Sequence, residues 1–317
     1  MRTLAAVFGL SLRVSQLYIM EAKNFTVNMT GGIRERGIGM LHQLSRAALL
    51  SGDLPDIEFS LVVGDVGWAN GTLREGDEIP KLALWSFSRR LGDEHYDPLW
   101  LVPDFNFRSW TGVVDSYPSF RKAAAAPDVD VPVKERTQKM IWRGNPLTNP
   151  TLREALLNVT RDKPWADVQP IAWEDDHITG PAVSMPDHCR YALNVHTEGV
   201  SWSGRLKFLL NCHAVTAVHS LEWRAFYYHL LKFDGAKQNV VATKRDFSDL
   251  ETTAQQLLGD SEKMQRIADN GAAMFRDRYL TPAAVSCYWR QLFRSYAEVA
   301  FVPSKEGDQG VAFEQYM

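Results

Sequence analysis

The stretch "KMIWRGNPLTNPTLREALLNV" (residues 139–159) decides the fold, because it joins a buried strand to a helix through a short turn. Residues 139–144 form a compact apolar run that ends in Arg-Gly, as a buried strand does. Asn149 is a typical N-cap, Pro150 suits the first helical position, and Leu152 to Leu157 supply an apolar face. The stretch therefore predicts a strand–turn–helix unit of an α/β protein.

The same alternation continues towards the C-terminus. We predict strands at residues 191–195, 214–219 and 239–243, and helices at 204–213, 247–258, 261–280 and 282–301. Strands that alternate with helices form a parallel sheet, so residues 139–258 predict a Rossmann-like layer.

The N-terminal half also alternates, although less regularly. A helix is predicted at 38–51, and buried strands at 57–63, 81–88 and 99–105. The Ala-, Pro- and charge-rich segment 122–135 is interpreted as the linker or lead-in to a second domain. We therefore predict a first Rossmann-like domain over residues 1–135, a second over 136–302, and a loosely ordered polar tail over 303–317.

Composition narrows the class of protein. The chain has 317 residues, of which 45% are hydrophobic and 23% charged, and its net charge is −3. These values predict a globular protein and give no general basic excess for nucleic acid. No run of about 18 apolar residues predicts a membrane span. The start "MRTLAAVFGLSL" resembles a weak signal peptide that lacks a small-residue cleavage site.

Cysteines and sequons bear on the compartment. Three cysteines allow either one disulfide with a free thiol or three buried thiols; they are Cys189, Cys212 and Cys287. Four N-glycosylation sequons, which often arise by chance, hint at a secretory route; they begin at Asn24, Asn28, Asn70 and Asn158.

The common nucleotide and metal motifs are missing from the sequence. There is no GxxxxGK[ST], and "GIGMLH" (37–42) supplies two of the three glycines of GxGxxG without a clear preceding strand. The eight histidines lack metal-ligand spacing, so we expect no resident cofactor and no metal. "EDDH" (174–177) has the ligands for a divalent cation, but its polar surroundings favour a solvated loop.

The segment 199–207 predicts an anion site. Gly199, Ser201, Ser203 and Arg205 follow a strand and precede a predicted helix, whose first amides and dipole favour negative charge. The serine hydroxyls can donate to phosphate, and an arginine fork suits a diphosphate. Alternatively, Ser203 is an ordinary N-cap and Arg205 a solvated residue, which the local pattern alone slightly favours.

Further polar residues stand at predicted strand ends. Arg143 and Gly144 end one strand, where open α/β sheets bind ligands, although a surface arginine beside a turn glycine is an equal alternative. Asp65 ends another and could act as a general base, although turn aspartates are common there. Glu222 precedes an aromatic cluster, "WRAFYY", that either faces a sugar or base or packs a helix.

Taken in order, several motifs resemble the fungal capsule-associated (CAP-ten domain) proteins of glycosyltransferase family 90 and the related Rumi-type protein O-glucosyltransferases. The motifs are "FSLVVGD" (59–65), "LALWSFSR" (82–89), "IWRGNPLTNPTLRE" (141–154), "DHCRYALNVHTEGVSWSGRLKFLLNCHAV" (187–215), "LEWRAFYYHLL" (221–231), "NVVATKRDFSDL" (239–250) and "CYW" (287–289). The resemblance covers about residues 55–300.

This resemblance implies a GT-B fold, with two Rossmann-like domains facing a cleft and C-terminal helices packing back on them. The second domain would bind UDP-xylose or UDP-glucose, and the first would receive the acceptor. It also implies an inverting transfer to a glycan or protein hydroxyl in the secretory pathway. Relatives carry a membrane anchor and extra residues before the catalytic domain, so completeness of the first domain is left open.

Carried over by position, Asp65 matches the catalytic base, within a motif that is usually Arg-Asp-Tyr-Pro-like but has Gly64 and Val66-Gly67 here. Arg205 matches the arginine at the diphosphate, Arg143 that of the "[WF]RG" motif, and Glu222 the donor-side acid of "EW". The altered surroundings of Asp65 motivate an alternative, a non-catalytic relative that binds nucleotide sugars or glycans. A hydrolase is disfavoured, because no close pair of acidic motif residues stands out.

Overall fold

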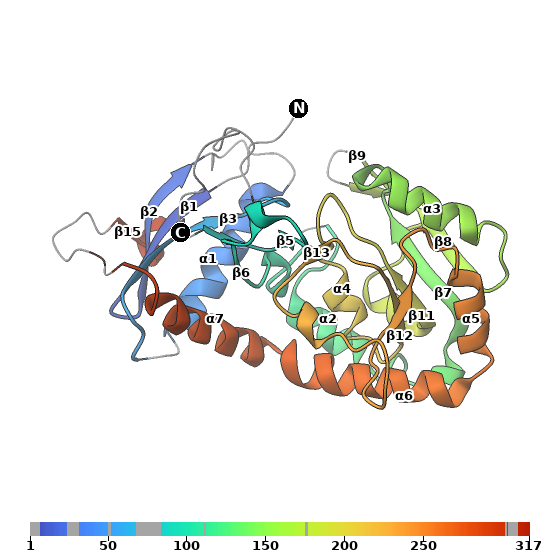
Figure 1. Ribbon diagram of the computed structural model, residues 1–317. Helices are drawn as coiled ribbons and strands as arrows, with labels where there is room; N and C mark the ends of the chain where they lie inside the picture. Colours follow the sequence, from blue (N-terminus) through green and yellow to red (C-terminus); the bar gives the residue numbers. More distant parts are fainter. Residues whose placement is uncertain are drawn as a thin grey trace. The chain divides into compact units, whose positions relative to one another are not determined.

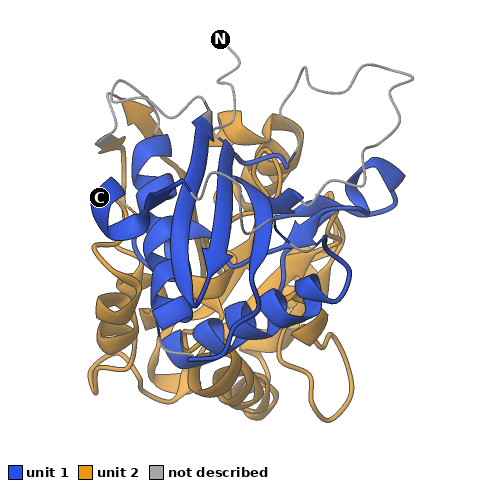
Figure 2. Cartoon of the chain, turned by 90° about the vertical axis from the view of Figure 1, so that its left-hand side faces the viewer, with its two compact units in different colours: residues 1–109, 223–226, 282–317 blue, residues 110–222, 227–281 orange. Residues whose placement is uncertain are grey.

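The structure is a computed structural model that describes residues 7–23, 32–49, 52–67, 84–110, 112–174, 177–301, 303 and 310–317. The chain forms two compact units (Figure 2). Unit 1 comprises Met1–Ser109, Trp223–Phe226 and Pro282–Met317, and unit 2 comprises Trp110–Glu222 and Tyr227–Thr281.

These boundaries differ from the predicted ones. The first unit ends at Ser109 rather than at residue 135, and the predicted linker belongs to unit 2. There it contains the end of helix α2 (Tyr117–Ala124) and the buried Val129 and Val133. The segment is thus part of the second unit, as a lead-in would be, and does not link two units.

Unit 1 is built on a six-stranded mixed sheet of order β15-β2-β1-β3-β4-β6 (Figure 1). Its strands are β1 (Val7–Arg13), β2 (Gln16–Lys23), β3 (Ile57–Val62), β4 (Leu84–Ser86), β6 (Trp100–Leu101) and β15 (Val311–Ala312). Its helices are α1 (Ile33–Leu49), α7 (Pro282–Ala297) and α8 (Phe313–Tyr316), and β5 (Arg89–Arg90) pairs with β13 (Trp223–Arg224).

The first half of this sheet departs from the predicted Rossmann-like pattern. β3, β4 and β6 are parallel, but β1 pairs antiparallel with both β2 and β3. The turn between β1 and β2 is Val14-Ser15, both with positive φ, and such a two-residue turn forces an antiparallel hairpin. Of the apolar start that resembled a signal peptide, residues 7–12 lie in strand β1, with Phe8, Leu10 and Leu12 buried, and residues 1–6 lie outside the described residues.

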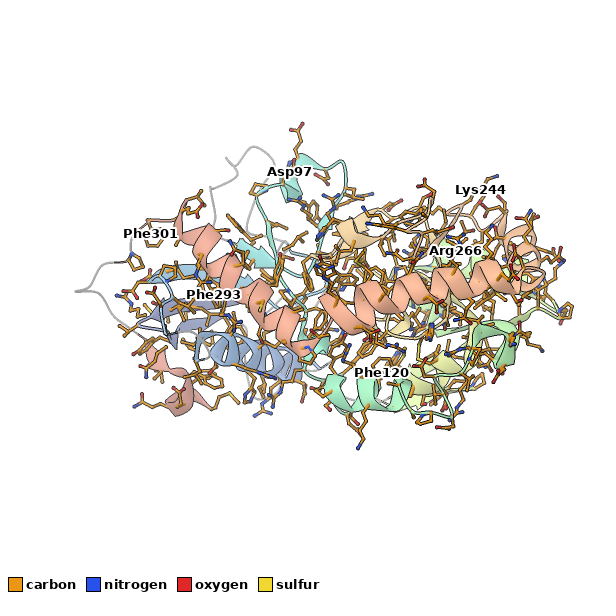
Figure 3. The ribbon with its side chains drawn as sticks, turned by 90° about the horizontal axis from the view of Figure 1, so that it is seen from below. Asp97, Phe120, Lys244, Arg266, Phe293 and Phe301 are labelled. Carbon is orange, nitrogen blue, oxygen red and sulfur yellow. A yellow bond between two sulfur atoms is a disulfide. The ribbon has the colours of Figure 1, made fainter. Side chains whose placement is uncertain are left out.

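Aromatic packing closes the core of unit 1. Trp85 on β4 stacks on Phe59 of β3 with ring centroids 3.8 Å apart, and it also contacts Phe293 and Trp289 of α7. Figure 3 labels Phe293 on this helix. The predicted C-terminal helix thus packs on the first sheet, as expected for helices that return to the domains.

Residues 310–317 of the polar tail are more ordered than predicted. Val311–Ala312 forms β15, which pairs with β2 at the edge of the sheet. Phe313 follows, is 8% exposed, and meets the His42 ring edge-on at 5.3 Å. The backbone pairing and one buried aromatic hold residues 310–317 in place.

Unit 2 is a parallel α/β layer. Its five-stranded sheet has the order β14-β12-β11-β7-β8, with every pair parallel. The strands are β7 (Thr137–Gly144), β8 (Ala166–Pro170), β11 (Tyr191–His196), β12 (Val215–His219) and β14 (Val241–Thr243), and β9 (Ala172–Glu174) and β10 (His177–Thr179) form a separate ribbon. The remaining helices are α3 (Pro150–Thr160), α4 (Leu206–Leu209), α5 (Leu250–Leu258) and α6 (Ser261–Gly271), which continues as a π-helix over Ala272–Tyr279.

Burial on one face of this sheet explains why α3 forms where predicted. Asn149 caps the helix, since its Oδ1 accepts from the Leu152 amide at 3.4 Å. Leu152 and Leu156 then pack against Met140 and Trp142 of β7. Each such side chain contributes about 1.5–3 kcal/mol by leaving water.

Candidate functional site

The sheet of unit 2 has a topological switch point between β7 and β11. Numbered along the chain, its strands lie in the order 2-1-3-4-5, so the connections from the two central strands run in opposite directions. Ligands of open α/β sheets bind at the carboxyl ends of the strands at such a point. The Trp142 indole Nε1 donates to Thr197 Oγ1 at 3.0 Å and ties the two strand ends together.

Seven of the eight predicted site residues lie at this carboxyl edge. They are Arg143, Gly144, Gly199, Ser201, Ser203, Arg205 and Glu222. Hydrogen bonds link the segments that carry them: Asn149 Nδ2 donates to the Gly199 carbonyl at 3.0 Å, and the Glu222 amide donates to Glu198 Oε1 at 3.0 Å. The sequence motifs from three strand ends therefore meet in one place.

The loop after β11 is held by its own backbone. The Gly199 amide donates to the Ser201 carbonyl at 3.0 Å, the Leu206 amide to the Ser203 carbonyl at 3.2 Å, and the Arg205 amide to Ser203 Oγ at 3.4 Å. Ser201 is buried, whereas Ser203 is partly exposed.

The helix predicted at 204–213 is much shorter in the structure. α4 has four residues, and its N-cap is Arg205 without a side-chain cap. Two of the amides expected to face an anion are used inside the loop, and a single turn carries little dipole. Any anion at this loop would thus depend mainly on side chains.

Arg205 is the predicted residue whose environment most resembles an anion site. Its guanidinium carbon lies 5.9 Å from the centre of the Trp142 ring. Its Nε is buried without a hydrogen-bond partner, and no carboxylate of the described residues forms an ion pair with it. Burial lowers the pKa of Arg205 to about 10, so the side chain still carries its charge at neutral pH.

Arg143 is engaged within unit 2. Its Nη2 donates to Asp167 Oδ1 at 2.7 Å, its Nη1 to the Asp167 carbonyl at 2.7 Å, and its Nε to the Pro181 carbonyl at 2.7 Å. The side chain thus joins β7, β8 and the segment after β10. Its role in donor binding stays a prediction.

Gly144 is required by packing. A Cβ at this position would lie 2.5 Å from Cζ2 of Trp142, closer than side chains approach each other. Glycine therefore lets the indole fold back beneath the end of β7, where it contacts Arg205.

Glu222 belongs to an acid–base network at the ends of β11, β12 and β14. Arg245 bridges Glu222 Oε1, at 3.1 Å, and Glu198 Oε2, at 2.8 Å. The Glu198 side chain is fully buried, while that of Glu222 is 45% exposed. Of these two carboxylates, Glu222 is therefore the one placed to meet a ligand.

Asp65 lies in unit 1, just after β3. Its Oδ1 accepts from Nη1 of Arg36 on α1 at 2.7 Å, and its side chain is 45% exposed. Arg36 is itself held over the Phe105 ring at 4.8 Å. The predicted base is thus accessible and oriented by a fixed arginine.

Sequence reasoning missed two histidines beside the loop. His196 and His219 stack with parallel rings 5.8 Å apart, and both are buried. The Glu198 amide donates to His219 Nε2 at 3.1 Å, and burial lowers the pKa of His219 to about 4. Both side chains are therefore neutral and help to shape the strand ends. The available signal was their position, since His219 ends one predicted strand and His196 directly follows another.

A disulfide joins Cys189 to Cys212, with the Cα atoms 4.9 Å apart, and Cys287 is an exposed thiol. The first of the two predicted cysteine arrangements is therefore confirmed. The bond closes a loop that contains β11 and all of the 199–205 segment. It ties both ends of the segment that carries Arg205.

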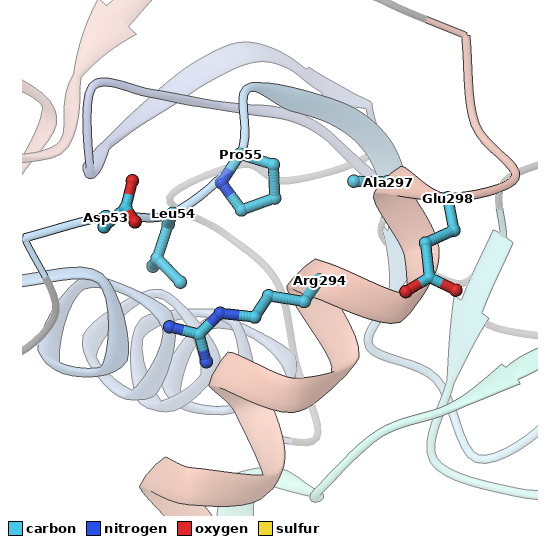
Figure 4. Close-up of a pocket in the computed structure, with 6 residues that line it drawn as sticks. All are labelled: Asp53, Leu54, Pro55, Arg294, Ala297 and Glu298. Carbon is cyan, nitrogen blue, oxygen red and sulfur yellow. The ribbon is translucent and has the colours of Figure 1, made fainter.

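A separate hollow of about 400 Å³ lies in unit 1 (Figure 4). It is lined by Asp53, Leu54, Pro55, Arg294, Ala297 and Glu298. None of the predicted site residues belongs to it, and its open, mixed lining gives it no evident chemistry.

The described residues contain neither a metal-ligand cluster nor a membrane-spanning helix. They hold no group of three or more His, Cys, Asp or Glu side chains that could bind a metal ion. Asp175 and Asp176 of the "EDDH" segment lie outside them. Within the same ranges, every helix is too short or too polar to cross a membrane.

Comparisons with known proteins agree on one family. The family model for glycosyl transferase family 90 matches residues 13–311. An "O-glucosyltransferase rumi homolog" of Aedes aegypti is 27% identical over 268 residues, which are 78% of this chain and 62% of the relative. "O-glucosyltransferase rumi" of Drosophila pseudoobscura is 30% identical over 167 residues, 51% of this chain and 38% of the relative.

The chain thus spans less than two thirds of the length of these relatives. Among solved structures, Anabaena HepE in complex with UDP-glucose matches with a TM-score of 0.35 and 11% identity, over 57% of this chain and 54% of that one. A likeness this weak carries no argument. The family match covers most of the chain, and the protein belongs to glycosyl transferase family 90.

Proposed function

We propose that the protein is an inverting glycosyltransferase that moves glucose or xylose from a UDP-sugar to a hydroxyl of a glycan or protein. Family membership and relatives named as O-glucosyltransferases support this proposal. The observation that carries it is the half-buried Arg205, whose buried Nε has no hydrogen-bond partner and which has no carboxylate partner among the described residues at the switch point of a parallel sheet. Such a cation suits an anionic ligand.

In this proposal unit 2 stabilises the leaving UDP. Arg205 contributes a charge-assisted hydrogen bond to the diphosphate, and Ser201 and Ser203 contribute hydroxyls. Glu222, with its half-exposed carboxylate fixed by Arg245, is proposed to contact the donor. Gly199 and Gly144 shape the loop and the strand end, and Arg143 is proposed to hold the strand ends that carry the donor contacts.

Asp65 is proposed as the general base that takes the proton from the attacking hydroxyl. An inverting displacement needs one such base on the face opposite the leaving group. The half-exposed carboxylate and its fixed contact with Arg36 support this assignment. In the proposed GT-B arrangement, unit 1 would present Asp65 and the acceptor to the donor bound on unit 2.

The disulfide supports a secretory location. Disulfides form and persist in oxidising compartments such as the endoplasmic reticulum lumen. Cys189–Cys212 is enclosed in unit 2, and the sequon residue Asn158 is exposed on α3. We therefore propose that the reaction takes place in the lumen of the secretory pathway.

A UDP-release assay with UDP-glucose, UDP-xylose and UDP-N-acetylglucosamine, with and without acceptor glycans and peptides, tests the proposal. Asp65→Asn should lower transfer by about a hundredfold or more, while UDP binding stays within about twofold. Asp97→Asn, at an exposed aspartate of the same unit, is the matched control and should leave transfer unchanged. Near-normal transfer by Asp65→Asn would show that the base lies elsewhere.

A second candidate function is binding of a nucleotide sugar without transfer. The ion pair with Arg36 favours it, because the guanidinium already occupies one oxygen of the Asp65 carboxylate, where a base would contact the acceptor hydroxyl. Calorimetric UDP binding without release from any donor, in the wild type as in Asp65→Asn, would support this candidate.

A further inference from the structure

A second arginine lies beside Arg205 at the switch point. Arg153, on α3, is 6% exposed. Its Nε donates to the Glu198 carbonyl at 3.1 Å, and its Nη1 donates to the Asn145 carbonyl at 2.6 Å. Asn145 directly follows β7 and Glu198 is the second residue after β11, so the guanidinium contacts both strand ends where the proposed donor would bind.

Arg153 and Arg205 share one aromatic ring. Their guanidinium carbons lie 5.8 Å and 5.9 Å from the centre of the Trp142 indole. Burial, and then the charge of Arg205, lower the pKa of Arg153 to about 9. Both side chains are therefore cationic at neutral pH and repel each other.

Neither guanidinium is paired with a carboxylate in the part of the chain that the structure describes. The nearby Glu198 side chain already pairs with Arg245 and accepts from the Glu222 amide. A buried Arg153 beside a half-buried Arg205 without an anion destabilises the fold by an amount that a bound anion offsets. The arrangement therefore indicates a ligand with more than one negative group.

One nitrogen of Arg153 remains available to such a ligand. Nη2 has no hydrogen-bond partner among the described residues, and it lies 3.6 Å from the position that a Cβ at residue 199 would occupy. Gly199 has no side chain there. Nη2 is thus beside the loop that carries Arg205.

We propose that Arg153 and Arg205 each bind one phosphate of a diphosphate, and that this pair makes the site select a nucleoside diphosphate over the monophosphate. The proposal rests on the proposed function, since it concerns the same donor site. A monophosphate can satisfy one arginine well, whereas a diphosphate provides acceptor oxygens for both. Arg153 would be a specificity-determining residue in addition to its links to β7 and β11.

Calorimetry with UDP and UMP on the full chain tests this. Arg153→Gln should weaken UDP binding about tenfold or more, the scale of one charge-assisted hydrogen bond, and UMP binding less than about threefold. Arg153→Lys, which keeps the charge but loses the fork, should fall between the wild type and Arg153→Gln. Arg161→Gln, at the exposed end of the same helix, is the matched control and should bind both nucleotides as the wild type does.

An equal loss of UDP and UMP affinity in Arg153→Gln would overturn the proposal, because it would show a purely structural role. Unchanged UDP affinity would overturn it as well. If thermal melting shows that Arg153→Gln does not fold, the affinities of the wild type for inorganic pyrophosphate and for phosphate decide between the outcomes. A preference for pyrophosphate of about tenfold or more supports the pair, and equal affinities contradict it. A wild type that prefers pyrophosphate but does not bind UDP refutes the proposed function alone.

Discussion

The ends of β7 and β11 each carry an arginine, and the two arginines differ in what surrounds them. Arg143 donates to Asp167 and to three carbonyls, so its charge and its donors are matched within unit 2. Arg205 lies against an indole with its Nε unpartnered and no carboxylate from the described residues. A matched cation indicates a structural role, and an unmatched cation indicates a place kept for a ligand.

The largest expected effect is on stability, and it tests Arg143, the arginine that is paired with a carboxylate. Arg143→Met should lower the free energy of unfolding by about 3–5 kcal/mol, because it leaves the Asp167 carboxylate without its cation. Urea unfolding measures this. Adding Asp167→Leu should recover much of the loss, since an apolar pair replaces a buried ion pair well. If Arg143→Met is as stable as the wild type but fails to bind UDP, Arg143 binds the ligand as Arg205 is proposed to do, and the two arginines do not differ in role.

Arg205→Gln tests the arginine that has no carboxylate partner among the described residues. Transfer should fall by about a hundredfold to a thousandfold, equivalent to about 3–4 kcal/mol, because the charge on the leaving UDP loses a donor. The free energy of unfolding should not fall, since an uncompensated cation is removed. UDP-release kinetics and a urea titration on the same preparation check both halves. A strong loss of stability with normal transfer would reverse the roles assigned to Arg143 and Arg205.

Removal of the disulfide should affect the surroundings of Arg205 more than those of Arg143. Cys212→Ser should lower the free energy of unfolding by about 3 kcal/mol, the scale for a loop of this length. The 199–205 segment lies inside the closed loop, whereas Arg143 lies outside it. Hydrogen exchange should therefore rise more around Arg205 than around Arg143. Equal protection at both places would mean that packing alone orders the loop.

The smallest effect concerns His188, whose pKa both arginines lower. Burial, then the charge of Arg205 and later that of Arg143, bring it to about 4 in the folded protein. The unfolded chain binds the proton below about pH 6.5, so this stability is complete above that pH and is lost as the pH falls towards 4. At pH 5.5 the loss should be about 1.4 kcal/mol. His188→Gln should unfold with a weaker dependence on pH; an identical pH profile would contradict the assignment.

The sequence predicted much of unit 2, and its residues show why. β7, β11 and β12 are apolar runs because both faces of a central parallel strand are covered, which a sequence shows directly. α3 carried its own N-cap and first-turn proline. The helix predicted at 204–213 has only four residues, and Leu206, Phe208, Leu209 and Leu210 are all buried. Their apolarity reflects enclosure rather than one helical face.

The site was predictable where one segment carries it and hidden where two segments meet. Ser201, Ser203 and Arg205 lie within a few residues of one another, so the loop was visible as a motif. Arg153 reaches the Glu198 carbonyl across 45 positions of sequence. Such a contact depends on how α3 packs on β7, which spacing along the chain does not show.

The order of segments along the chain has a consequence for synthesis on the ribosome. Unit 1 starts first, but it needs β13, α7 and β15, and β15 begins at Val311. All of unit 2 has been made once Thr281 has been added. Because domains generally fold as units during translation, the parallel sheet should be in place while the first strands still wait for their edge partner and covering helix. Unit 2, in the second half of the chain, would then fold before unit 1.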